Sequence, residues 1–164
     1  PLYRAHEAQH CGKQASVVLD VKPRIERWRM TYIDCYLAPV PRENKAAYEE
    51  LAKISAQVVK EHGARRVFEC WLDETGPEAS SYHGEETRVN SEEYGNFVKA
   101  AGAGQGETVA MSFIEWPDKA TRDVGMEKVT SDPRMQFQNW PPTFDGRRLI
   151  AAGFEPMLDE SREA

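Results

Sequence analysis

The chain has 164 residues, a formal net charge of −6 and a hydrophobic fraction of 40%. This length suits one domain of ordinary size with a buried core. No apolar run approaches the roughly 20 residues that span a bilayer, and the charged N-terminus lacks the apolar stretch of a signal peptide, so we expect a cytoplasmic protein with no membrane partner. The three cysteines, Cys11, Cys35 and Cys70, are far apart, which argues against a disulfide framework or a Cys-rich zinc site.

The charge is distributed unevenly along the chain. Residues 1–29 hold six Lys or Arg against three acids, which leaves a net −9 on the remainder. An acidic body argues against a nucleic-acid partner, because binding to the phosphate backbone depends on Lys and Arg. Since Met30 directly precedes the first clear strand pattern, the simplest interpretation is that Met30 is the functional start and that 1–29 is an N-terminal extension that is poorly ordered or loosely docked. The extension would either come from an upstream choice of start or be a genuine accessory segment.

From residue 31 the patterns predict a series of strands and helices. The expected elements are a strand at 31–38, a helix at 43–62, a strand at 65–72, a polar loop at 73–106 with a short helix at 91–100, a strand at 107–116, a helix at 117–130, a short helix beginning at Pro133 and a strand at 148–157. Pro39 and Pro41 are expected to end the first strand. The order β-α-β-β-α-β is typical of a ferredoxin-like α+β domain with a four-stranded antiparallel sheet. We therefore expect one domain over 30–160, with an enlarged loop at about 73–106.

Alternation in the first two strands predicts which face of the sheet each side chain occupies. We expect the wholly apolar sets to face the helices; they are Ile33, Cys35 and Leu37 in the first strand and Phe68, Cys70 and Leu72 in the second. The opposite sets would then form the other face; they are Tyr32, Asp34 and Tyr36, and Val67, Glu69 and Trp71. A face that combines aromatic rings and carboxylates is too apolar for water and too polar for a plain core. A second subunit that covers this face and leaves a cavity between the sheets would satisfy both conditions.

Several segments, in their linked order, resemble the YbaA-like family of uncharacterised small bacterial proteins. They are MTYIDCYLAPVP, the helix end EHGA, the strands VFECWLD and ETVAMSFIEW, the motif DPRM, and FDGRRLIAAGFE. The resemblance covers about 30–159 and implies a ferredoxin-like subunit that pairs into a dimeric α+β barrel, that is, a homodimer. That superfamily includes cofactor-free monooxygenases, isomerases, haem enzymes and stress-response proteins without known chemistry, so the fold does not transfer a function. Some family members carry an RNA-related label, which the acidic body here does not support.

Two segments depart from the family pattern. Residues 1–29 have no counterpart, and the loop at 73–106 is longer than usual by a stretch around 80–95. The added stretch would be either a lid over the cavity or an idle insertion, and the idle insertion is the default because loops tolerate added length at little cost.

The most conspicuous motif is the zincin-like pattern formed by His6, Glu7 and His10. A zinc protease needs this motif on a long buried helix with a third ligand. Here Gly12 follows almost at once and no third ligand stands at a suitable spacing, so we predict no metal site.

Asp34 and Glu69 are the candidate catalytic residues. If both point into the cavity, burial would raise their pKa values and suit one of them to general acid or base catalysis. The alternative is that each carboxylate pairs with Arg65, Arg147 or Arg148, or with backbone donors.

Four further residues are candidates for ligand binding. Tyr36, Trp71 and Trp116 would either stack on a flat ligand or pack at the subunit interface. His83 would contribute only if the 73–106 loop closes over the cavity. No nucleotide-binding or nucleophile motif is present, so no cofactor is predicted. The predicted function is binding or conversion of a small apolar or aromatic compound in the barrel cavity, and the alternative is a non-catalytic dimeric stress-response or protein-interaction module.

Overall fold

The structure is a computed structural model that describes residues 31–90, 93–137 and 141–158. The predictions for residues 1–29, for the start at Met30 and for the zincin-like motif lie outside these ranges. Four strands form one antiparallel sheet in the order β2-β3-β1-β4. Their bounds are β1 (Tyr32–Pro41), β2 (Arg66–Trp71), β3 (Glu107–Trp116) and β4 (Ile150–Phe154). This topology confirms the predicted ferredoxin-like α+β fold.

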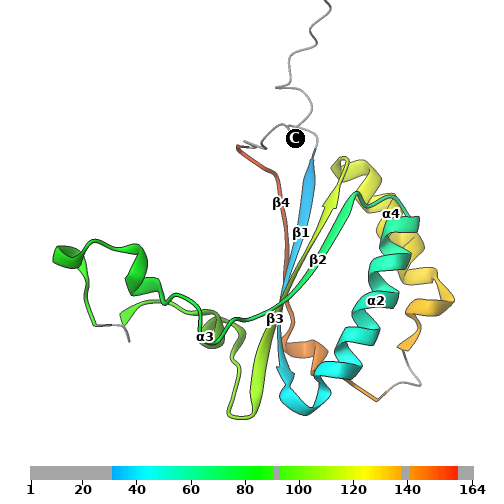
Figure 1. Cartoon of the computed structure of the whole chain (residues 1–164). Helices are drawn as coiled ribbons and strands as arrows, with labels where there is room; N and C mark the ends of the chain where they lie inside the picture. Colours follow the sequence, from blue (N-terminus) through cyan, green and yellow to red (C-terminus); the bar gives the residue numbers. More distant parts are fainter. Residues whose placement is uncertain (1–30, 91–92, 138–140, 159–164) are drawn as a thin grey trace, which may run out of the picture.

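Two helices cover one face of the sheet, and the other face has no helical layer over most of its length (Figure 1). The covering helices are α2 (Lys45–Glu61) and α4 (Lys119–Ser131). Short 3-10 helices join the elements at η1 (Arg42–Asn44), η5 (Pro133–Met135) and η7 (Gly146–Arg148). The segment 73–106, called the arm below, carries η2 (Ala79–Tyr82), η3 (Glu85–Thr87) and α3 (Phe97–Ala101) and projects on the uncovered side of the sheet (Figure 1).

Aspartate caps fix two of the helix starts. The Asp118 side chain accepts a hydrogen bond from the Thr121 amide at 2.6 Å, which begins α4. Asp132 accepts from the Arg134 amide at 2.9 Å, with proline in the first turn of η5. The helix predicted to begin at Pro133 is therefore present as a single 3-10 turn.

Three boundaries differ from the prediction. β1 continues through both prolines to Pro41. β4 pairs with β1 only as far as Leu37, so beyond that residue one side of β1 forms no strand pairing among the described residues and needs no backbone N–H donor there. Among the described residues 93–100, the α-helix expected at 91–100 is present only as α3, which begins after Asn96, whose side chain caps the Lys99 amide. The last strand is also shorter than 148–157, because η7 occupies its expected start.

The predicted assignment of the two sheet faces is wrong. Ile114, Trp116 and the helix residue Val59 share a buried cluster with Tyr32, Tyr36 and Val67 packed against it. The mixed sets of aromatic rings and carboxylates thus face α2 and α4, and they include Asp34, Glu69 and Trp71. The physical reason is that residues of the two helices provide hydrogen-bond partners for the polar atoms of these side chains. These atoms therefore need no partners from water or from a second subunit.

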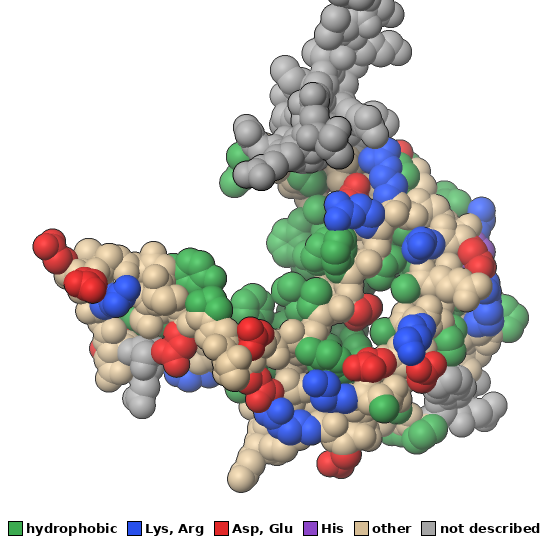
Figure 2. Space-filling view, viewed as in Figure 1, with side chains coloured by type: hydrophobic (Ala, Val, Ile, Leu, Met, Phe, Trp, Pro, Cys, Tyr) green, Lys and Arg blue, Asp and Glu red, His purple; other side chains and the backbone are tan. Residues whose placement is uncertain are grey.

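The members of the wholly apolar sets that lie within β1 and β2 point to the uncovered side, whereas Leu72 lies just beyond the end of β2. Register places ten apolar side chains there, called the open face below: Ile33, Cys35, Leu37, Phe68, Cys70, Met111, Phe113, Ile150, Ala152 and Phe154. All ten are half-buried or exposed, and Figure 2 shows hydrophobic side chains gathered on this side of the sheet. α3 packs across β1 and β3 at one end of the sheet, where Pro39 and Val109 are fully buried.

Candidate functional site

The helix-covered side of the sheet carries a row of polar residues across three strands. Tyr36 on β1 pairs in register with Ser112 on β3, which pairs with Glu69 on β2. Asp34 lies two residues from Tyr36 on the same face of β1. We call Asp34, Tyr36, Glu69 and Ser112, together with Arg122 of α4, the inner polar cluster.

Asp34 is fully engaged within this cluster. Its side chain is 3% exposed, and it accepts a hydrogen bond from the Trp116 indole at 3.0 Å. Arg122 Nε donates to both carboxylate oxygens, at 2.9 Å to Oδ2 and 3.1 Å to Oδ1. Of the two alternatives for this residue, the structure places Asp34 in an ion pair, although with Arg122 and not with Arg65, Arg147 or Arg148.

Tyr36 stands next to this ion pair. Burial and the negative charge of Asp34 raise the pKa of Tyr36 to about 12, against an opposing contribution from Arg122. The phenol therefore stays protonated at neutral pH and can only donate or accept a hydrogen bond.

Glu69, the other candidate catalytic carboxylate, is more exposed to solvent than Asp34. Tyr48 of α2 donates to its Oε2 at 3.2 Å. The residue as a whole is exposed on the edge strand, but protein atoms crowd its carboxylate, and this desolvation raises the pKa of Glu69 against the hydrogen bonds from Tyr48 and Ser112. A carboxyl group with a raised pKa is the kind suited to accept or donate a proton.

The two tryptophans predicted to bind a ligand contact their own helices. Trp71 donates from its indole nitrogen to Glu49 of α2 at 2.9 Å and stacks at a tilt on Tyr48. Trp116 is completely buried beneath α4, where a β-carbon on Gly125 would lie 2.6 Å from its ring. Both rings are therefore part of the packing between sheet and helices.

A groove of about 1380 Å³ lies between the arm and the adjoining ends of β2 and β3. The hollow beside the arm is visible in Figure 2. Its aromatic lining is Tyr82, Tyr94 and Phe97, and its polar lining includes Arg42, which pairs with Glu74 at 2.7 Å. His83 lies in the arm and is exposed, with its ring 4.9 Å from that of Tyr94.

The sequence patterns did not single out Arg122, Tyr48 or Phe97. Arg122 and Tyr48 occupy helical positions that are typical of a solvent-facing or ordinary core side chain, and only the packed fold places them over Asp34 and Glu69. Within the described ranges, no group of three or more His, Cys, Asp or Glu is placed to hold a metal ion. No helix among the described residues is long and apolar enough to cross a membrane.

The strand order and the two helices on one face of the sheet define a ferredoxin-like α+β protein. The chain belongs to the family described as protein of unknown function (DUF1428), whose model matches residues 31–146. It is 37% identical over 131 residues to the uncharacterised protein YbaA of Escherichia coli (strain K12). The matched region covers 80% of this chain and 100% of YbaA. The YbaA proteins of Escherichia coli O157:H7 and Shigella flexneri match to the same extent. The resemblance drawn from the separate sequence segments is thereby confirmed.

Proposed function

We propose that the chain forms a homodimer and binds a small apolar or aromatic compound in the groove between the arm and the sheet. The observation that supports this most directly is the groove of about 1380 Å³ with three aromatic side chains in its wall. Small-molecule sites are concave and mostly apolar, with a few polar groups that orient the ligand. The rings of Tyr94 and Phe97 would stack on the compound, and the Arg42–Glu74 pair would supply the polar contacts.

The open face supports the homodimer. Exposed apolar patches of this kind mark interaction surfaces, and Phe68 and Phe113 stack there with ring centroids 4.6 Å apart. A second copy carries the same face, so a twofold interface would match apolar surface with apolar surface. The cavity expected between two sheets would then lie against the open face, and Asp34 and Glu69 would lie outside it.

The structure gives less support to a catalytic role for Asp34 than to one for Glu69. Asp34 has its lone pairs occupied by Arg122 and Trp116, so it is poorly placed to move a proton. Glu69 retains that capacity, but it does not line the groove. We therefore propose binding as the function and leave Glu69 as the one acid or base candidate.

The ligand proposal is tested with Nile red, a neutral aromatic dye whose fluorescence rises in apolar sites. We expect the dye to bind the wild-type protein and the Phe97→Ser variant to weaken binding by about tenfold, since it removes a half-exposed ring from the groove wall. Val124→Ser, which removes an equally exposed apolar side chain from α4, is the matched control. Loss of dye binding in Met111→Ser and not in Phe97→Ser would place the apolar site on the open face and refute the groove.

The second candidate is a non-catalytic protein-interaction module. It is favoured by the packing of Trp116 and Trp71 against the helices and by the ion-paired state of Asp34. Native mass spectrometry of protein isolated directly from its host separates the two candidates. A retained small molecule would support the binding protein, and co-purified protein chains without one would support the interaction module.

A further inference from the structure

The arm carries apolar side chains that its own subunit does not cover. Tyr82 is 77% exposed and Val89 is 52% exposed. α3 anchors the base of the arm on β1 and β3, and η2 and η3 extend beyond it, away from the sheet (Figure 1). Because the arm projects on the same side of the sheet as the open face, a second copy that covers the open face would lie beside the arm and these side chains (Figure 1).

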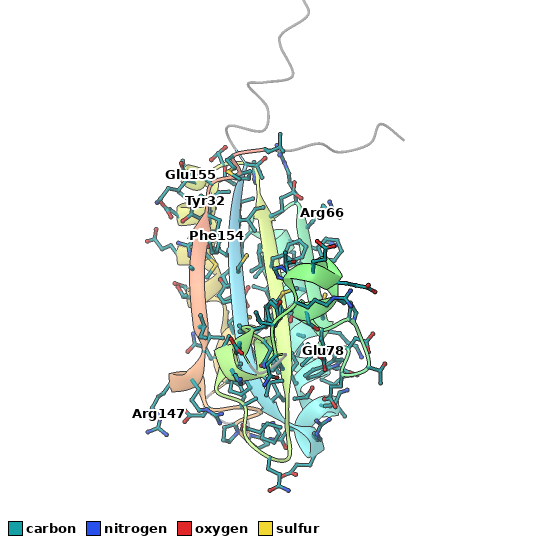
Figure 3. All side chains as sticks on the ribbon, turned by 90° about the vertical axis from the view of Figure 1, so that its left-hand side faces the viewer. Tyr32, Arg66, Glu78, Arg147, Phe154 and Glu155 are labelled. Carbon is teal, nitrogen blue, oxygen red and sulfur yellow. The ribbon has the colours of Figure 1, made fainter. Side chains whose placement is uncertain are left out.

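The arm is acidic, and an exposed arginine stands at the opposite end of the open face. The described arm residues hold six carboxylates against two basic side chains, Arg88 and Lys99. Arg66 stands at the far end of the open face, above the Phe68 ring at 4.6 Å, where it pairs with Glu115 of β3 at 3.7 Å. Its side chain is still 61% exposed, which leaves guanidinium surface for a further acidic contact. Figure 3 places Arg66 near one end of the sheet and Glu78, at the root of η2, toward the other.

The open face is the central part of the surface that a homodimer would bury. At about 4.8 Å between strands and about 6.7 Å between side chains on one face, ten positions cover roughly 300 Å² of projected area. A stable interface of standard size buries about 800 Å² of accessible surface on each partner, a measure that is larger than the projected area of the same contact. The arm extends on the same side as the open face, so it would add to the surface that a homodimer buries there.

These observations point to one arrangement, which rests on the homodimer proposed above. We propose that the arm of each protomer embraces the other protomer, so that the acidic turn η3 lies against Arg66 of the partner subunit and Tyr82 covers the edge of the partner's open face. In this arrangement the twofold axis lies between the two sheets and perpendicular to the strands, so that the strands of the two protomers run in opposite directions. The arm end of each protomer then lies beside the Arg66 end of its partner. The groove between arm and sheet is then completed by the second subunit.

Isotope-labelled cross-linking tests this arrangement. The full chain is prepared in ¹⁴N and ¹⁵N forms, each with photoreactive benzoylphenylalanine at position 82, and the two are mixed, exchanged and irradiated. We expect cross-linked peptides that join one light and one heavy chain and that connect position 82 to the peptide containing Arg66 and Phe68. Cross-links confined to chains of the same label, in a sample that sedimentation shows to be dimeric, would overturn the inference and leave the homodimer standing.

A charge-reversal variant gives an independent measurement. Glu85→Lys combined with Glu86→Lys should raise the dimer dissociation constant by about tenfold, because it places two cations against Arg66 of the partner subunit. Glu50→Lys combined with Glu127→Lys makes the same change in charge on α2 and α4 and should leave the constant unchanged. An equal effect of the two pairs would overturn the arm contact, and a monomeric wild-type chain would refute the homodimer and the arm contact together.

Discussion

At the scale of single residues, the buried carboxylate of Asp34 shows how the fold accommodates charge within its core. Asp34 is held between the Trp116 indole on β3 and the Arg122 guanidinium on α4. Removing a buried charge from water is costly unless a partner and hydrogen bonds compensate, and both are present here. The ion pair therefore ties α4 to the sheet in one orientation.

Arg122→Met should destabilise the protein by about 2–4 kcal/mol, because it leaves Asp34 buried without its cation. The lower part of that range allows for the partial exposure of the Arg122 side chain. Urea denaturation at pH 7 measures the change in the free energy of unfolding. Arg147→Met, at a side chain that is 90% exposed, is the control and should change it by less than about 0.5 kcal/mol. Equal effects of the two variants would contradict a structural role for the Asp34–Arg122 pair.

At Gly125, α4 lies directly against the Trp116 side chain of β3. A β-carbon there would lie 2.6 Å from the Trp116 ring and 2.6 Å from the carbonyl oxygen of His62. Gly125→Ala should therefore cost about 1–3 kcal/mol, although alanine is favoured over glycine by about 1 kcal/mol within a helix. Thermal and urea unfolding measure the change, with Val124→Ala as the control at the exposed neighbour. A more stable Gly125→Ala protein would show that the helix and the ring do not meet this closely.

At the scale of elements, one bidentate ion pair joins the base of the arm to the sheet. Arg148, at the end of η7, donates from Nη1 at 2.7 Å and from Nη2 at 2.9 Å to the two carboxylate oxygens of Glu107. The Gly104 amide donates to Glu107 at 2.7 Å, and Arg148 also reaches the Gly102 carbonyl at the end of α3. These contacts fix the start of β3, the approach to β4 and the root of the arm relative to one another.

The stability contributed by this ion pair should depend on pH. Hydrogen bonds from Arg148 and Gly104 lower the pKa of Glu107 to about 2, below the value near 4.3 of an unfolded glutamate. A lowered folded-state pKa adds stability above the unfolded pKa, and this stability is lost as the pH falls toward 2. Glu107→Gln should therefore cost about 1–2 kcal/mol at pH 7 and progressively less between pH 4.3 and pH 3.

Urea unfolding of the wild type and of Glu107→Gln at pH 7, 4.5 and 3 measures this trend. Glu127→Gln, at an exposed position on α4, is the control and should show little difference at any of the three values. A Glu107→Gln effect that stays constant from pH 7 to pH 3 would mean that the charge of Glu107 does not stabilise the fold.

At the scale of the whole molecule, the sheet has one face sealed by helices and one face left apolar. β4 is exposed along its whole length, and Met111 stands near the middle of the open face at 36% exposure. Met111→Lys should leave the isolated subunit folded and shift the proposed dimer to monomer at micromolar concentration, since a cation would oppose its own copy across the interface. Light scattering measures the mass, with Val124→Lys on the helical side as the control. A wild-type chain that is already monomeric would refute the homodimer.

Some parts of the molecule are specified by local sequence patterns and others are not. Strand β3 was predicted with its observed bounds, because Glu107–Trp116 is long, rich in β-formers and limited by glycine and proline. The candidate carboxylates were recognised as unusual from their place in the strands, but their partners Arg122 and Tyr48 are 88 and 21 residues away in the sequence. No local pattern specifies contacts over such separations, so the ion pair and the tyrosine hydrogen bond were missed.

The sequence by itself determined the order and type of the elements, through helical and strand periodicities and through caps such as Asp118 and Asp132. Only the tertiary structure decided which face of each strand meets the helices. The reason is physical: both faces of β1 and β2 carry enough apolar surface to be buried, so a two-residue period alone does not distinguish them. The choice depends on where the polar atoms of Asp34, Glu69 and Trp71 find partners, and α2 and α4 supply those partners only once they are packed.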